Sequence, residues 1–330
     1  MQEPLEPARD AGAVSPQTPP LPTIPDHQMI RLIGGGSGGD VWLAKNALGT
    51  YRAVKIVQGR SFKQRRPFER EFNGVLQFEP VSRLHDGLVN VLQVGHNEAA
   101  GYFYYVMELA DDIATGRLVI PESYHPRTLE YDFRQRGRLP IGECVRLGAA
   151  VASALGFLHR HGLIHRDIKP SNIIFVNGFP KLADLGLVTE MSETTTCVGT
   201  EGFMPPEGAG TAQADVYSLG KVLYEISTGL DRNDYPTLPT PLADTAEDRD
   251  LVSFNRIVLN ACRGDTSRRY QTAEELLTAL LSFQFSHYNP GRERFNLRII
   301  KIVAMVGAIV GFMVFIAAVW RLLRLLEHGP

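Results

Sequence analysis

The sequence predicts an α+β fold: a small β-sheet part with one helix, then a larger helical part, and one transmembrane helix near the C-terminal end. Up to residue 109, short runs rich in β-branched and aromatic residues predict strands. Beyond residue 140, apolar residues recur at the spacing of amphipathic helices. Residues 302–320 contain no charged side chain, and this run is long enough to cross a bilayer as a helix.

The composition is that of a globular protein. The chain has 330 residues, of which 44% are hydrophobic and 21% charged, so a wholly disordered or fibrous chain is excluded. Lysine and arginine total 34 against 36 acidic residues, and the net charge of −2 gives no reason to expect a nucleic-acid partner. Cys144, Cys197 and Cys262 are too widely spaced for a disulfide framework or a paired-cysteine metal site, as expected in a reducing cytosol.

Residues 1–26 predict a disordered tail. They contain seven prolines and almost no apolar periodicity, which favours a solvated, partly polyproline segment. Docking to a proline-binding module is the alternative. No apolar stretch follows a basic start, so these residues do not predict a signal peptide.

Residues 27–109 predict a small sheet with one helix. The helix is expected over residues 61–78, where Phe68, Phe72 and Val75 follow helical spacing. Glycine or asparagine lies near the ends of the other apolar runs, as is typical of strands joined by turns. The strands are expected over residues 29–33, 40–45, 51–57, 91–96 and 102–109.

Residues 110–286 predict a mainly helical part. Thr272 and Glu275 have the spacing of a capping box ahead of an apolar run, so a helix is expected to begin there. Gly162 suits the end of an earlier helix, and no repeat with a period of 20–50 residues is visible. The three other helices are expected over residues 144–158, 216–226 and 251–262.

The C-terminal part predicts a membrane anchor. Residues 302–320 would span roughly 28 Å as a helix, close to the ~30 Å hydrocarbon core of a bilayer. A basic linker, 287–301, precedes this run, Trp320 ends it, and a short tail, 321–330, follows. A fully buried core helix is the alternative. The flanking basic residues are Arg298, Lys301, Arg321 and Arg324.

A glycine-rich segment follows the first predicted strand. Gly34, Gly36 and Gly39 form a G-x-G-x-x-G pattern, and Val41 lies two positions further on. Glycines at this spacing let backbone amides approach phosphates without clashes from a Cβ atom. Any glycine-rich hairpin could show the same pattern. It is not a Walker A motif, because no Gly-Lys-Ser/Thr follows, and it does not lead into a helix as a dinucleotide motif does.

Lys55 lies in an apolar strand, sixteen residues after Gly39. Taken alone, such a lysine more often alternates outward to solvent. A lysine that points under the glycine-rich loop would instead pair with nucleotide phosphates and would need a carboxylate to hold it. The predicted helix offers Glu71, or Glu69 two positions earlier.

Two further motifs identify a family. The segment HRDIKPSN occupies residues 165–172, and DLG begins at Asp184, seventeen residues after Asp167. In this order, the motifs over residues 27–286 resemble the Ser/Thr class of eukaryotic-type (Hanks-type) protein kinases, of the bacterial membrane-anchored kind. The resemblance implies a bilobal protein-kinase fold, with a small antiparallel N-lobe over 27–109 and a helical C-lobe over 110–286. It also implies ATP and Mg²⁺ as cofactors, with Mn²⁺ as a substitute.

The resemblance implies roles for four polar residues. Asp167 would accept the proton of the substrate hydroxyl or orient that hydroxyl for in-line attack. Lys169 would lie near the transferred phosphate, where Ser/Thr kinases place a lysine. Asn172 and Asp184 would hold Mg²⁺, which bridges the phosphates.

The resemblance also implies a nucleotide site between the two lobes. Lys55 paired with Glu71 would complete the catalytic site, and Met107 and Glu108 would form the gatekeeper and hinge. Backbone groups from Glu108 to Ala110 would contact adenine. The residues expected to bind ATP are Gly34, Gly35, Gly36, Ser37, Gly38, Gly39, Val41, Ala53, Lys55, Glu71, Met107, Glu108 and Ala110.

Four residues further along the chain match structural positions of the family. Thr200 stands where Ser/Thr kinases use a threonine to contact the catalytic aspartate and lysine. Glu207 ends a segment that resembles the substrate-docking region ending in Ala-Pro-Glu, although a proline replaces the alanine. Asp215 would anchor the catalytic loop. Arg269 would form a salt bridge with Glu207, but neighbouring Arg268 could take that place if the register differed by one.

Two segments of the chain are longer than the corresponding segments of most kinases. The long stretches are residues 77–88 and 110–128, and the second would shape the mouth of the cleft.

The activation segment, between Asp184 and Glu207, predicts regulation. Arg166 beside the catalytic aspartate could pair with a phosphate on this segment. Autophosphorylation is expected within Thr194, Thr195 and Thr196; a solvated loop without phosphorylation is the alternative.

The sequence therefore predicts a single-pass membrane kinase whose catalytic domain faces the cytoplasm, where ATP is found. Its expected partners are proteins with Ser or Thr hydroxyls, and Gly307 and Gly311 form a G-x-x-x-G spacing that could pair two transmembrane helices. A pseudokinase scaffold is one alternative, although Lys55, Asp167 and Asp184 are all present. A small-molecule phosphotransferase is the other, although such enzymes lack the docking segment.

Overall fold

The computed structural model describes residues 22–36, 38–61, 65–184, 189–190, 199–240 and 245–288. Several predicted features lie outside these residues, so their predictions stay as they are. They are most of the tail 1–26, Ser37, Cys197, the candidate phosphorylation sites Thr194, Thr195 and Thr196, the membrane span 302–320 with Gly307 and Gly311, and the tail 321–330.

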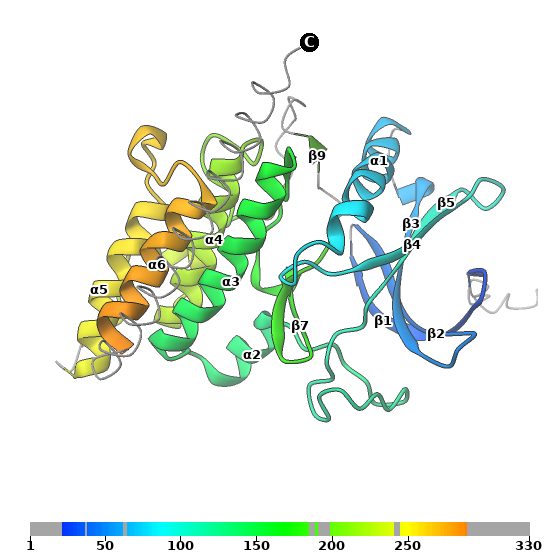
Figure 1. Cartoon of the computed structure of the whole chain (residues 1–330), viewed down its shortest axis with the longest axis horizontal. Helices are drawn as coiled ribbons and strands as arrows, with labels where there is room; N and C mark the ends of the chain where they lie inside the picture. Colours follow the sequence, from blue (N-terminus) through cyan, green and yellow to red (C-terminus); the bar gives the residue numbers. More distant parts are fainter. Residues whose placement is uncertain are drawn as a thin grey trace, which may run out of the picture.

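A five-stranded antiparallel sheet forms the smaller lobe, shown in blue and cyan in Figure 1. Its spatial order is β1-β2-β3-β5-β4, so the chain runs along the sheet and then places β5 between β3 and β4. All five predicted strands are present, each within a few residues of its expected ends. They are β1 (His27–Gly36), β2 (Gly39–Asn46), β3 (Tyr51–Gln58), β4 (Val91–Asn97) and β5 (Tyr102–Met107).

Both faces of this sheet are covered. Helix α1 (Arg65–Ser82) packs on one face, where the rings of Phe68 and Phe72 lie 5.2 and 5.1 Å from that of Phe103. Ile24 is buried on the other face, so the packed domain begins a few residues before the predicted boundary at residue 26.

The larger lobe is helical, as predicted. Helix α3 (Ile141–Arg160) lies at its centre and contacts helices α4, α5 and α6 (Figure 1). The short helix α2 and two two-stranded ladders were not predicted, because elements of two to eight residues give too little periodicity. The other elements are α2 (Leu129–Arg136), β6 (Leu163–Ile164), β7 (Ile173–Val176), β8 (Phe179–Leu182), β9 (Thr189–Glu190), α4 (Ala212–Thr228), α5 (Ala246–Ala261) and α6 (Ala273–Tyr288).

The predicted cap of α6 is present. The Thr272 hydroxyl accepts a hydrogen bond from the Glu275 backbone N–H at 3.2 Å, while the Glu275 carboxylate accepts from the backbone N–H of Gln271 at 2.8 Å. The carboxylate thus reaches one residue further back than in a capping box.

Within the described ranges, only α3 is long and apolar enough to cross a membrane. In its most apolar stretch, 67% is buried inside the protein, as in the core helix of a globular domain. The predicted span 302–320 is not among the described residues.

Candidate active site

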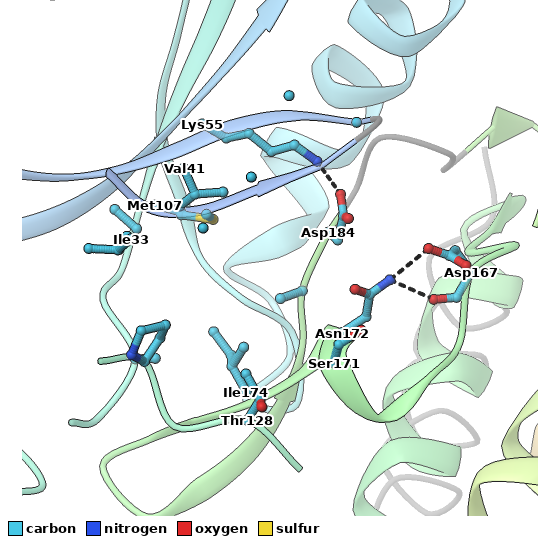
Figure 2. A pocket seen from close by; sticks show the side chains of 18 of the residues that line it. Ile33, Val41, Lys55, Met107, Thr128, Asp167, Ser171, Asn172, Ile174 and Asp184 are labelled. Atoms are coloured by element: carbon cyan, nitrogen blue, oxygen red, sulfur yellow. Dashed lines mark hydrogen bonds and ion pairs between the residues drawn. The ribbon is translucent and has the colours of Figure 1, made fainter. Parts of the chain in front are cut away.

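A cavity of about 720 Å³ lies between the two lobes, and most residues predicted from the motifs meet there (Figure 2). Gly36 pairs with Gly39 across the hairpin. The predicted residues that line the cavity are Gly34, Gly35, Gly38, Gly39, Val41, Ala53, Lys55, Glu71, Met107, Glu108, Ala110, Asp167, Lys169, Asn172, Asp184 and Thr200.

Nine further described residues line the cavity and were missed. Residues two positions apart in a strand point to the same face, so alternation could have found Ile33, two residues before Gly35, and Ile174, two residues after Asn172. Tyr124, Pro126 and Thr128 come from the long stretch after the hinge, where no pattern in the sequence indicates which side chains point into the cavity. The nine are Ile33, Tyr124, Pro126, Thr128, Glu130, Ser171, Ile174, Ala183 and Gly199, and Leu109 lines the cavity within the predicted stretch Glu108 to Ala110.

The turn between β1 and β2 needs its glycines. Gly39 has a φ of +109°, and a Cβ atom there would lie 2.4 Å from the backbone oxygen of Ile56. A Cβ atom on Gly38 would lie 3.2 Å from the Lys55 ammonium. The glycine-rich hairpin therefore lies close over Lys55, as a phosphate-covering loop requires.

Lys55 points into the cavity and not to solvent, which excludes the alternative that its strand position left open. The residue is only 3% exposed, and its ammonium donates a hydrogen bond to the Asp184 carboxylate (Figure 2). Burial lowers the pKa of Lys55, but Tyr105 and the carboxylates of Asp184 and Glu71 outweigh it, so the pKa lies above its usual value. The lysine is a fixed positive charge.

The carboxylate that pairs with Lys55 differs from the prediction. Glu71, and not the exposed Glu69, is the helix residue that lines the cavity, which decides between the two candidates. Nevertheless Oε1 of Glu71 is buried with no hydrogen-bond partner among the residues that the structure describes, and the ammonium bonds to Asp184. The predicted Lys55–Glu71 ion pair is therefore replaced by Lys55–Asp184, because the side chain of Asp184 comes within hydrogen-bonding distance of the lysine.

This burial predicts a pH dependence that depends on Glu71. Burial raises the pKa of Glu71 to about 7; Lys55 lowers it and Asp184 raises it. The folded protein then holds a proton that the unfolded chain releases near pH 4.5, so the stability from this group is complete below that pH. This contribution to the free energy of unfolding is about 3 kcal/mol at most, and it is lost as pH rises through about 7. Glu71→Gln should therefore weaken the decline in the free energy of unfolding between pH 5 and 8.

Denaturant unfolding at several pH values measures this effect. Glu69→Gln is the matched control, because Glu69 is exposed on the same helix. Parallel pH curves for the wild type and Glu71→Gln would contradict the prediction.

Asp167 lies at the centre of a hydrogen-bonded cluster. Its Oδ1 accepts a hydrogen bond from the Thr200 hydroxyl at 2.6 Å, and its Oδ2 accepts from Asn172 Nδ2 at 2.9 Å. Lys169 Nζ lies 2.7 Å from the same Oδ2 and donates to the Thr200 hydroxyl at 2.9 Å. The predicted contacts of Thr200 with Asp167 and Lys169 are thus present in the structure.

Asn172 and Asp184 present oxygen atoms suited to a hard cation. The Asn172 amide nitrogen donates to Asp167, at both the carboxylate and the backbone oxygen (2.9 and 2.8 Å), so its amide oxygen is turned toward Asp184 (Figure 2). Burial raises the pKa of Asp184, but Lys55 and, more weakly, His165 and Lys169 lower it below its usual value. An ionised carboxylate beside an amide oxygen is the donor set that Mg²⁺ prefers.

Asp215 holds the catalytic loop in place from α4. Its carboxylate is 1% exposed and accepts hydrogen bonds from the backbone N–H groups of His165 and Arg166 at 2.9 and 2.8 Å. His159 Nε2 lies 2.9 Å from the same carboxylate. Arg166 has a φ of +68°, a conformation that a residue other than glycine holds only when its surroundings fix it.

Arg269, and not Arg268, forms the predicted ion pair with Glu207. The Arg269 side chain is fully buried, with Nη1 and Nη2 at 2.5 and 3.3 Å from the two carboxylate oxygens. It also donates to the backbone oxygen of Arg263 and lies over the ring of Tyr217. Arg268 lies in a short 3₁₀ turn. Because Arg269 forms the ion pair with Glu207, the predicted register is correct.

The hinge offers a backbone acceptor and a backbone donor to a ligand. The Glu108 side chain is directed elsewhere, because Lys181 Nζ and the backbone N–H of Asn90 donate to it at 2.6 and 2.8 Å. No hydrogen bond among the described residues reaches the backbone carbonyl of Glu108 or the backbone N–H of Ala110, and both residues line the cavity. An adjacent acceptor and donor match the edge of an adenine base.

Comparison with known proteins agrees with this geometry. Residues 27–283 match the protein kinase domain. The chain belongs to the protein kinase family. The kinase is 28% identical to the serine/threonine-protein kinase PrkC of Bacillus subtilis over 271 residues, which cover 76% of this chain and 39% of PrkC. It is 30% identical to the serine/threonine-protein kinase PknB of Mycobacterium leprae over 293 residues, covering 78% of this chain and 44% of PknB.

A third bacterial relative shows a similar identity and coverage. The kinase is 28% identical to a probable serine/threonine-protein kinase of Clostridium perfringens over 273 residues, covering 76% of this chain and 37% of that protein. The chain thus spans less than half the length of these curated relatives. The matched kinase-domain segment, residues 27–283, contains all the described residues that line the cavity.

Proposed function

We propose that this kinase is an ATP-dependent protein serine/threonine kinase, which transfers the γ-phosphate of Mg-ATP to Ser or Thr hydroxyls of protein substrates. The observation that carries the proposal is the grouping of Lys55, Asp167, Asn172 and Asp184 around one cavity. Their charges and hydrogen-bonding groups suit a transfer that depends mainly on positioning and electrostatic stabilisation.

Asp167 would orient the substrate hydroxyl and accept its proton. Two donors, the Thr200 hydroxyl and Asn172 Nδ2, fix its carboxylate, so it would be positioned before the substrate arrives. Lys169 lies beside it and would stabilise the negative charge that develops on the transferred phosphate. The link from Lys169 to Thr200 connects the catalytic loop to the segment ending at Glu207, where a protein substrate would dock.

The other half of the site would bind the nucleotide. Lys55 would contact the phosphates beneath the glycine-rich hairpin, and the free hinge groups of Glu108 and Ala110 would contact the base. Asn172 and Asp184 would hold Mg²⁺, with Mn²⁺ as a substitute. When bound, such an ion would neutralise charge on the phosphates.

A phosphate-transfer assay tests the proposal. Purified full-length protein is incubated with labelled ATP, Mg²⁺ and a generic protein substrate, and acid hydrolysis then identifies the labelled amino acids. We expect label on serine and threonine of the substrate and very little with Asp167→Asn. No transfer by the wild type would favour the pseudokinase alternative. Label on a small molecule but not on protein would favour the other alternative.

We infer further that the kinase is anchored to the cell membrane, with its catalytic domain in the cytoplasm. The support is the uncharged run 302–320 with its basic flanks. We expect the full chain to remain in the membrane pellet after an alkaline carbonate wash, and a chain truncated after residue 301 to be soluble. Release of the full chain by that wash would contradict the anchor. Pairing through Gly307 and Gly311 stays a prediction, which crosslinking of Gly307→Leu against the wild type would measure.

Autophosphorylation of the activation segment is also proposed. Arg166 precedes the catalytic aspartate, and Thr194, Thr195 and Thr196 lie between Asp184 and Glu207. After incubation with Mg-ATP, peptide mapping should find phosphate on one or more of these threonines. Replacing all three by alanine should remove that label. A segment without label in active wild-type protein would contradict the proposal.

A further inference from the structure

The stretch 110–128, hereafter the insert, forms an ordered loop in the space between the lobes, drawn in teal below β7 in Figure 1. Asp112 organises it, because its carboxylate accepts hydrogen bonds from the backbone N–H groups of Ala114, Thr115 and His125 at 2.7–2.9 Å. Burial alone would raise the pKa of Asp112, but the hydrogen bonds from His125, Thr115 and Ala114 lower it to about 2. The loop therefore keeps its charged centre at physiological pH.

The insert is attached to the larger lobe. The Asp111 carboxylate accepts hydrogen bonds from the backbone N–H groups of Asn177 and Gly178 at 2.9 and 2.7 Å, in the turn between β7 and β8. Arg127 forms a two-pronged ion pair with Asp132 at the start of α2, with its shortest distance 2.6 Å. These contacts fix both ends of the insert on the helical lobe.

The insert is also attached to the smaller lobe through Arg31 on β1. Arg31 Nε donates to the backbone oxygen of Pro121 at 2.7 Å, and its Nη2 donates to the backbone oxygen of Tyr124. On the same strand, Ile33 and Gly34 line the cavity from above. The insert thus links the two lobes beside the hinge.

Tyr124 connects the insert to the hinge. Its side chain is fully buried and lines the cavity, and its hydroxyl donates to the backbone carbonyl of Ala110 at 3.0 Å. The N–H at the other end of the same peptide group, from Asp111, donates to the backbone oxygen of Phe175 at 2.7 Å. The peptide that follows Ala110 is therefore held on both sides, while the N–H of Ala110 stays available to a ligand.

We propose that Tyr124 is a positioning residue for the nucleotide, and that Arg31 holds it in place from the opposite lobe. The inference rests on the proposed function, since the ligand is the adenine base of a nucleoside triphosphate. The hydroxyl of Tyr124 fixes the peptide after Ala110, and this orients the free hinge donor toward the base. Arg31 fixes the backbone of Tyr124 and keeps the β1 strand close above the base.

Nucleotide affinity tests the proposal separately from phosphate transfer. We would measure the Kd of the hydrolysis-resistant analogue AMP-PNP with Mg²⁺ by titration calorimetry on the full-length protein. Tyr124→Phe keeps the ring and removes one hydrogen bond to a buried carbonyl, so the Kd should rise about 3- to 10-fold. The kcat at saturating ATP should stay within about twofold, because nothing near Asp167 changes.

Arg31 gives a second, independent variant. Arg31→Ala should raise the Kd in the same direction, and Arg31→Lys should restore part of the affinity. Because both residues act through the insert, the double variant Arg31→Ala with Tyr124→Phe should raise the Kd by less than the product of the single effects. Matched controls are Tyr131→Phe on α2 and Arg52→Ala on β3, where the Arg52 side chain donates to the backbone oxygen of the adjacent Tyr51.

The outcomes distinguish the positioning role of Tyr124 from the proposed kinase function. An unchanged Kd in Tyr124→Phe, or a fall in kcat and melting temperature without a rise in Kd, would overturn the role of Tyr124. If the wild type binds AMP-PNP as described but transfers no phosphate to protein, the proposed function fails and the inference stands. If the wild type binds no nucleotide, both fail.

Discussion

Asp167→Asn should lower the kcat for phosphate transfer by about 10²- to 10⁴-fold, the contribution usual for a positioned catalytic base. The carboxylate accepts from Thr200 and Asn172 and lies 2.7 Å from Lys169 Nζ. An amide has the same shape but lacks the negative charge, and its NH₂ group would face one of these donors. The variant should therefore fold but lose both the proton acceptor and part of the alignment of the substrate hydroxyl.

Two measurements make this prediction specific. The Kd for AMP-PNP with Mg²⁺ should stay within about twofold, since the contacts to the phosphates and the base are made by other residues. Asp86→Asn, at an exposed aspartate, should keep full activity. Residual activity above about one tenth of the wild type would be inconsistent with Asp167 as the base.

The catalytic loop could be predicted from the sequence because its functional residues are close together in the chain. Asp167 and Asn172 are five residues apart, and the side chain of Asn172 bonds to Asp167 within one turn of the loop. The alternation and spacing of apolar residues also predicted the strands and the long helices. The roles of these loop residues, like the choice of Arg269 over Arg268, came from the family resemblance and not from any local pattern.

The contacts of Lys55 and Tyr124 could not be predicted in the same way. The partner of Lys55 lies 129 residues away, and two carboxylates compete for the lysine, so the choice depends on how α1 and the residues after β8 pack together. Tyr124 lies 93 residues from Arg31, in an insert without periodicity whose turns are set by the side chain of Asp112. The sequence indicated where the insert begins and ends, but tertiary contacts decide which of its side chains reaches the cavity.

The second large effect is on stability: Arg269→Ala should lower the free energy of unfolding by about 3 kcal/mol, at the lower end of the range for breaking a buried ion pair. Arg269 is fully buried, and its loss would remove two bonds to Glu207 and two to the backbone oxygen of Arg263. The Glu207 side chain is 32% exposed, so water can solvate part of the charge left behind. This partial solvation is the reason for choosing the lower end.

Urea unfolding of the wild type and variants measures this loss. Arg268→Ala is the matched control and should change stability by less than about 0.5 kcal/mol, as is usual for surface positions. Arg269→Lys should recover only part of the loss, because one ammonium cannot replace the two-pronged contact with Glu207 and also reach the backbone oxygen of Arg263. Since Glu207 ends the segment that carries Thr200, Arg269→Ala should also raise the KM for the protein substrate more than the KM for ATP. Equal stability losses in the Arg268 and Arg269 variants would show that the buried ion pair contributes little to holding this segment in place.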